Sequence, residues 1–164
     1  MKRLLLLSMF FCLNGFLFSQ SSATKDSIPA YISKGVIPAF KVYKAPDSSV
    51  FTNNDIQKNR PILLMIFSPD CGHCQHVATE ITKNIDHFNK VQILMFTWLP
   101  YSDMMSFDKT YKIADFPQIT LGWDPKYFFL PYYHVSSYPK LIVYNKKGKY
   151  VKEFQGNIQI EDVC

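Results

Sequence analysis

The longest apolar segments lie in the middle of the chain, and their spacing predicts strands alternating with helices. Pro61–Phe67 is continuously apolar and of strand length, which is typical of a central strand buried on both faces. Val91–Trp98 predicts a second strand, and Ser102–Ile113 a helix after it. Between the two strands, apolar residues recur every three or four positions, which predicts a helix with one buried stripe made of Cys74, Ala78, Ile81, Ile85 and Phe88.

Shorter patterned segments flank this centre. Residues 37–43 and 49–51 alternate well enough to predict a short strand pair. Two apolar runs within 140–154 are separated by Asn145-Lys146-Lys147-Gly148-Lys149, which predicts a hairpin. Residues 114–130 match no element. Strand, helix and strand followed by a late hairpin predict an α/β layer with a mixed sheet.

The first twenty residues have the composition of a targeting segment. Lys2-Arg3 is basic, Leu4–Leu13 is apolar, and small residues follow within 19–23. This order predicts a signal peptide over 1–20 with cleavage within 19–23, and therefore an exported, periplasmic protein. A retained N-terminal membrane anchor is the alternative.

Length and charge limit the remaining possibilities. The chain of 164 residues has room for one domain. We expect a polar linker over 21–36, the domain over 37–157 and a short tail over 158–164. The formal net charge of +5 falls to +3 when Lys2 and Arg3 are removed. The remaining positive charges are scattered, so the sequence gives no support to a nucleic-acid partner.

Two cysteines separated by two residues stand where the central strand gives way to the first helix. The segment is Cys71-Gly72-His73-Cys74. The positive end of a helix dipole favours the thiolate form, which is the reactive form, on Cys71. Cys71 lies at the open end of the helix and would attack, whereas Cys74 is sheltered and would resolve the mixed disulfide. The pattern predicts a dithiol that cycles with a disulfide, and export fits a redox-managed compartment.

Other uses of the pair remain open. The cysteines could form a static structural disulfide or half of a metal site. Zinc commonly needs four ligands, and the chain has no second pair with this spacing. The sequence therefore predicts no metal and no cofactor, although a metal set could be drawn from Cys71, Cys74, His73, His76, His134 and Cys164.

The chain resembles thioredoxin-fold proteins, and more narrowly the exported TlpA/ResA-type thiol–disulfide oxidoreductases. Three blocks carry the resemblance: 61–74 with the two cysteines, 132–144 with Pro139, and the closing hairpin and glycine over 145–156. It implies a three-layer α/β fold with a central mixed sheet and an N-terminal strand extension. It also implies an insertion, within 99–130, between the catalytic helix and a cis-proline.

The resemblance assigns roles to individual residues. Pro139 matches the cis-proline that faces the active-site cysteines, and the backbone before it pairs with a substrate strand. A protonated His73 would stabilise the thiolate. The resemblance therefore implies a catalytic set of Cys71, Cys74, His73 and Pro139, and substrate contacts at Tyr138 and Gly72.

The chain departs from the family pattern in several places. Asp70 stands where an aromatic residue usually precedes the first cysteine, and Met65 stands where thioredoxin has a buried acid. Only eight residues follow Gly156, so the family's terminal helix is expected to be missing or truncated. An aromatic run could form either a substrate surface or core; it comprises Trp123, Tyr127, Phe128, Phe129, Tyr132 and Tyr133.

The resemblance implies that the protein reduces disulfides in other exported proteins, for instance apocytochromes, and is recharged by a membrane reductant donor. The Gly72-His73 dipeptide, found in protein disulfide isomerases, favours net oxidase or isomerase activity as an alternative. A non-catalytic metal-binding or chaperone role is the other alternative. Cys164 is expected to be an incidental tail cysteine rather than a third redox thiol.

Overall fold

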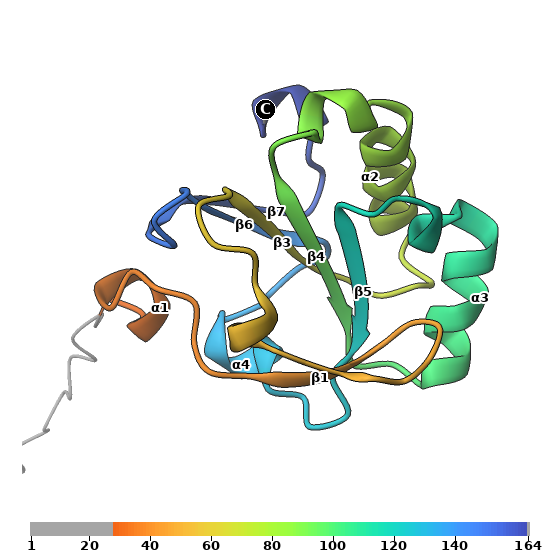
Figure 1. Ribbon diagram of the computed structural model, residues 1–164, viewed down its shortest axis with the longest axis horizontal. Coiled ribbons are helices and arrows are strands. Elements are labelled where there is room, and N and C mark those ends of the chain that lie inside the picture. The colour runs from red at the N-terminus through yellow and green to blue at the C-terminus, as the bar shows by residue number, and fades with distance from the viewer. Residues whose placement is uncertain (1–27, 164) are drawn as a thin grey trace, which may run out of the picture.

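A seven-stranded mixed sheet runs through the molecule in the order β2-β1-β5-β4-β3-β6-β7 (Figure 1). The computed structural model describes residues 28–163, so the expected signal peptide and Cys164 lie outside the described residues. The strands are β1 Lys41–Lys44, β2 Val50–Thr52, β3 Ile62–Ile66, β4 Gln92–Thr97, β5 Ile119–Trp123, β6 Lys140–Tyr144 and β7 Tyr150–Gln155. The helices are α1 Ala30–Ser33, α2 Gly72–Lys83, α3 Tyr101–Tyr111 and α4 Phe129–Tyr132, with 3-10 turns at Asn53–Asp55, Ile85–Phe88, Ile113–Asp115 and Ile160–Asp162.

The central strand is β3, as the apolar run Pro61–Phe67 predicts. All five of its residues are buried. It pairs in parallel with β4 and antiparallel with β6, so both its edges are covered. A continuous apolar run is required here because helices cover both faces of the sheet.

Two cores lie on the two faces of the sheet. On one face, α2 and α3 pack their apolar stripes, including Cys74, Ala78 and Phe107, against the sheet. On the other face, Tyr31 of α1 and Phe129 of α4 pack against the alternate residues of the same strands. Figure 1 shows these helices on opposite sides of the strands. The arrangement confirms the predicted three-layer α/β fold with a mixed central sheet.

The segment 99–130, expected to be an insertion, supplies both a helix and a strand. It contains α3 and β5. Strand β5 pairs in parallel with β4 and antiparallel with β1, so it connects the N-terminal hairpin of β1 and β2 to the rest of the sheet. The sequence pattern did not predict β5, because Thr120 and Gly122 interrupt its apolar character.

Gly122 is the place where β5 tolerates no side chain. A Cβ there would lie 2.9 Å from side-chain atoms of both Phe96 and Val42. We expect Gly122→Ala to lower the free energy of unfolding by about 1–3 kcal/mol through overpacking, as measured by urea denaturation. Thr120→Ala on the same strand adds no atoms and is the control. An unchanged midpoint for Gly122→Ala would show that Phe96 and Val42 have room to move aside.

The domain extends beyond both predicted boundaries. Tyr31 is 2% exposed, and the carbonyl of Gly35 accepts a hydrogen bond from the Tyr150 amide at 2.8 Å, so residues 30–36 are not a free linker. Ile158 and Ile160 are buried in the core beside α2, so 158–163 is not a loose tail. Both predicted boundaries are too narrow for the same reason: the few apolar residues in these terminal segments pack against residues that are distant in sequence.

After β7, the described chain forms a single 3-10 turn, Ile160–Asp162, where the resemblance places a terminal helix. Among residues 28–163, no helix has both the length and the apolar character to cross a membrane.

Candidate active site

Cys71 caps the helix that it precedes. It is the N-cap residue of α2, and its Sγ accepts a hydrogen bond from the Cys74 amide at 3.4 Å. Gln75 donates through Nε2 to the Pro69 carbonyl at 2.9 Å, which fixes the loop before the cysteine. The sulfur therefore lies at the N-terminal end of α2, where the unpaired N–H groups stabilise negative charge.

The two cysteines differ in exposure as the helix pattern predicts. Both are thiols in this structure; Cys71 is partly exposed and Cys74 is fully buried. Burial, and then the hydrogen bond with Cys71, raise the pKa of the Cys74 thiol well above its ordinary range. Cys74 is therefore a protected, protonated thiol at neutral pH, and Cys71 is the sulfur that another molecule can reach.

The segment before β6 brings a second backbone to the cysteines. The Tyr138–Pro139 peptide bond is cis, and the Cys71 thiol donates to the Tyr138 carbonyl at 3.7 Å. Pro139 has no N–H, so the Tyr138 carbonyl is the polar backbone group presented here. Another cis bond, Ala45–Pro46, was not predicted from the sequence.

Trp98 is a residue of this site that the sequence analysis missed. Its ring packs on the Tyr138 ring with centroids 4.8 Å apart. Trp98 directly follows β4, whose end lies beside the end of β3 because the two strands are parallel and in register. The position of Trp98 at the end of the strand next to β3 is the sequence feature that could have placed it in the site. Trp98 provides an aromatic surface there, whereas the position before the first cysteine, aromatic in the family pattern, is Asp70.

The carboxylates near the cysteines are arranged differently from those of thioredoxin. Met65, at the position of the buried acid, is fully buried. Glu80 of α2 instead pairs with the exposed Lys83 at 3.3 Å. Asp70 is exposed and accepts a hydrogen bond from the Ser68 hydroxyl. Neither Met65 nor Glu80 therefore serves as an internal proton acceptor for Cys74.

The histidines lie on the surface. His73, His76 and His134 are exposed, and residues 28–163 contain no group of three or more His, Cys, Asp or Glu placed to hold a metal ion. Gly72 is also exposed, which leaves the approach to Cys71 open.

The aromatic run over 123–133 belongs mainly to the core rather than to a substrate surface. Phe129 and Tyr133 are buried on the α4 side of the sheet, and the Tyr133 hydroxyl shares a hydrogen bond of 2.9 Å with that of Tyr144. Tyr127 is 55% exposed. Most of the run therefore fills the layer opposite α2, whereas Trp123 packs on the α3 side of the sheet, so the run is mainly packing.

Comparison with known proteins places this geometry in context. A sequence model described as a thioredoxin-like domain matches residues 53–164. No curated protein sequence matches the chain. Among solved structures, the fold is similar to that of the exposed lipoprotein thioredoxin Etrx1 from Streptococcus pneumoniae, with 22% identity, a TM-score of 0.57, and coverage of 77% of this chain and 95% of that one.

Two further structures have the same fold. A secreted disulfide oxidoreductase of Mycobacterium tuberculosis, homologous to DsbE of E. coli, has 16% identity and a TM-score of 0.64 over 76% of this chain and 90% of that one. StoA from Bacillus subtilis has 16% identity and a TM-score of 0.60 over 79% and 96%. With a matching family model over most of its length and a dithiol at the start of α2, the chain belongs to the thioredoxin-like family.

Proposed function

We propose that the protein is an exported thiol–disulfide oxidoreductase that reduces disulfide bonds in other exported proteins. One observation carries the proposal: the accessible sulfur of Cys71 caps α2 and lies 3.7 Å from the Tyr138 carbonyl, with Cys74 buried behind it. This arrangement suits a dithiol in which the accessible sulfur of Cys71 attacks the substrate and the buried sulfur of Cys74 reacts only afterwards.

The proposed cycle moves two electrons. The Cys71 thiolate attacks one sulfur of a substrate disulfide, and the other substrate sulfur leaves as a thiolate that takes up a proton. Cys74 then loses its proton and attacks the Cys71 sulfur of the mixed disulfide. The second substrate thiol departs, and the Cys71–Cys74 disulfide remains. A thiol donor must reduce that disulfide before the next cycle, and we propose that this donor is a membrane protein.

The neighbouring residues support this cycle. Tyr138 presents its backbone to a substrate strand beside the cysteines, and Pro139 keeps that edge free of an N–H. Exposed Gly72 leaves room for the incoming chain. His73, when protonated, stabilises the Cys71 thiolate. The periplasm is the proposed location, and it is supported by two proteins of similar fold, of which one is an exposed lipoprotein and the other is secreted.

Net oxidation or isomerisation is the second candidate, because exposed His73 next to Cys71 favours the reduced, thiolate form. The reduction potential of the Cys71–Cys74 couple separates the two, measured on purified protein equilibrated with glutathione buffers. A value near or below that of thioredoxin, about −270 mV, supports a reductase. A value at or above about −180 mV favours an oxidase or isomerase. The absence of a measurable couple would return the pair to a structural or metal-binding role.

Two single changes should move this potential in opposite directions. A protonated His73 would stabilise the Cys71 thiolate, so His73→Ala should destabilise the reduced form and make the potential more negative. Asp70→Asn removes a repelling carboxylate, so the potential becomes less negative. The same glutathione titration measures both. His76→Ala, on the exposed side of α2 beyond the cysteines, is the control and should leave the potential unchanged. Shifts of equal sign in the first two variants would exclude an electrostatic cause.

A further inference from the structure

We infer that Lys140 is a positioning residue: its buried ammonium holds the 133–139 loop so that the Tyr138 backbone is presented beside Cys71. Lys140 is the first residue of β6 and directly follows Pro139. Its side chain is 1% exposed although it carries a charge. A lysine in such a place requires compensation, because removing a charged group from water is costly.

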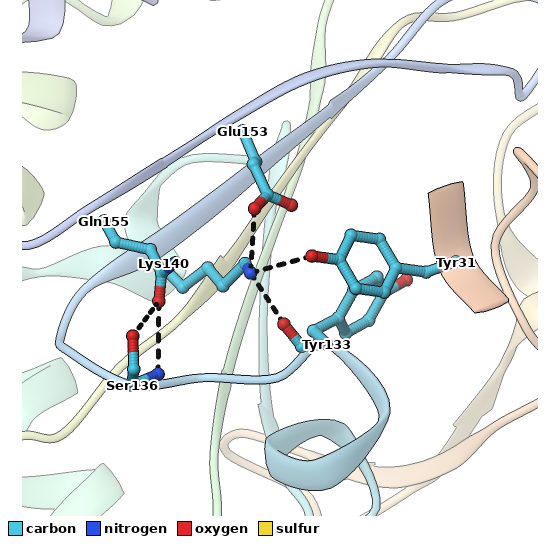
Figure 2. A network of polar contacts seen from close by, with 6 residues as sticks. All are labelled: Tyr31, Tyr133, Ser136, Lys140, Glu153 and Gln155. Carbon is cyan, nitrogen blue, oxygen red and sulfur yellow. Dashed lines mark hydrogen bonds and ion pairs between the residues drawn. The ribbon is translucent and has the colours of Figure 1, made fainter. Parts of the chain in front are cut away.

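The compensation comes from three separate parts of the chain (Figure 2). The ammonium donates to the Tyr133 carbonyl at 2.6 Å, to the Tyr31 hydroxyl at 3.1 Å and to the Glu153 carboxylate at 3.1 Å. A lysine ammonium has three N–H donors, so every donor has a partner. Tyr31 lies on α1 and Glu153 on β7, which means that the ammonium joins the two ends of the domain to the start of the loop.

Lys140 is connected to both ends of the 133–139 loop. Its backbone follows the last loop residue, and its side chain binds the carbonyl of the first, Tyr133. The middle of the loop is fixed separately, because both the amide and the hydroxyl of Ser136 donate to Oε1 of Gln155 at 3.1 Å (Figure 2). The Gly156 amide donates to the Pro139 carbonyl at 3.0 Å. Tyr138, which contacts Cys71, therefore lies on a loop whose two ends and middle are fixed by hydrogen bonds.

The side chain of Lys140 points away from the cysteines. Along β6, Ile142 and Tyr144 face the α4 side with Lys140, whereas Leu141 faces α2. Lys140 therefore cannot take part in sulfur chemistry and acts only through the position of Tyr138. This inference rests on the proposed function, because it assumes that a substrate disulfide docks along the Tyr138 backbone.

The test is steady-state reduction of a fluorescence-quenched peptide disulfide, with dithiothreitol as the electron donor and the non-enzymatic rate subtracted. We expect Lys140→Met to raise KM while kcat stays the same, because docking is lost and the chemistry of Cys71 is kept. What is lost is backbone hydrogen bonding between the substrate and the Tyr138 segment, so a rise in KM of about two- to ten-fold for each lost bond is expected. Lys140→Arg, which restores a buried cation with several donors, should recover part of the affinity.

Removing Lys140 alone leaves Glu153 without its partner and can impair folding. The double variant Lys140→Met, Glu153→Gln removes both charges and is the second test, with the same rise in KM expected. Lys152→Met is the matched control: Lys152 is an exposed lysine of β7 whose ammonium donates to the Asp162 carbonyl, and its loss should not alter KM.

The outcomes separate the inference from the function. If wild-type turnover depends on Cys71 and the Lys140 variants keep their KM, or lose only kcat through a smaller folded fraction, the positioning role is wrong and the proposed function stands. If turnover survives in Cys71→Ser, Cys71 is not the attacking sulfur; the proposed cycle is then wrong, and the inference falls with it.

Discussion

Replacing Cys71 with serine is expected to reduce disulfide turnover to the uncatalysed rate while leaving the fold intact. The Cys71 side chain is partly exposed at the edge of the core, so serine can occupy the N-cap position of α2 and accept the same amide hydrogen bond. What is lost is the accessible sulfur at the N-terminal end of α2. The quenched-peptide assay measures turnover, and thermal unfolding measures the fold.

Cys74→Ser provides the complementary result. The first exchange still occurs at Cys71, but no sulfur is placed to resolve it, so mixed disulfides between Cys71 and the peptide should accumulate and be visible by mass spectrometry without reductant. Cys164→Ser is the control and should keep wild-type turnover. Turnover that persists in Cys71→Ser but disappears when Cys164 is also replaced would transfer the attacking role to the tail cysteine.

The second large effect concerns stability in alkaline solution. Burial raises the pKa of Tyr133 and of Tyr144 well above the ordinary tyrosine value of about 10. In the unfolded chain both phenols ionise near about pH 10, whereas in the folded chain they remain neutral, so the unfolded state releases protons first. Their contribution to stability is complete below about pH 10 and is lost as the pH rises beyond it, by about 1.4 kcal/mol per pH unit for each phenol.

Urea denaturation between about pH 8 and 11 should therefore show a steep loss of unfolding free energy, about 3 kcal/mol per pH unit when both tyrosines titrate in the unfolded state. Tyr133→Phe should lower the slope by about 1.4 kcal/mol per pH unit, the share of one phenol. Burial also raises the pKa of Tyr31, so a slope larger than that of Tyr144 alone should remain. The reduced protein should begin its decline earlier, above the ordinary thiol pKa of about 8.5, because the pKa of Cys74 is also raised by burial. A free energy independent of pH across this range would contradict the burial of the two phenols.

The parts that could be predicted from the sequence are those with a local signal. The run Pro61–Phe67 became β3, and the spacing from Cys74 to Ile81 became the buried stripe of α2. The difference in exposure between Cys71 and Cys74 followed from their positions on that helix. These elements are specified by periodicity and by capping within a few residues.

What could not be predicted depends on partners that are distant along the chain. Lys140 reads as a polar residue at the start of a strand, and its burial is explained by Tyr31, 109 positions earlier, and Glu153 together with the Tyr133 carbonyl. Trp98 reads as the end of a strand, and only the fold stacks it on Tyr138. In both cases the role of the residue is set by a contact with a residue outside its own element.

The order of strands in the sheet has a consequence for how the chain is made. The hairpin of β1 and β2 reaches the rest of the sheet through β5, with Tyr43 opposite Trp123, and α1 is held by a residue of β6. The N-terminal hairpin and α1 are synthesised first, but their partners β5 and β6 are synthesised late. Most of the chain must therefore be present before the sheet can be completed. Such long-range pairing slows folding. If the protein is exported as proposed, a nascent chain that stays open in this way remains available for threading through a translocation pore until its second half has emerged.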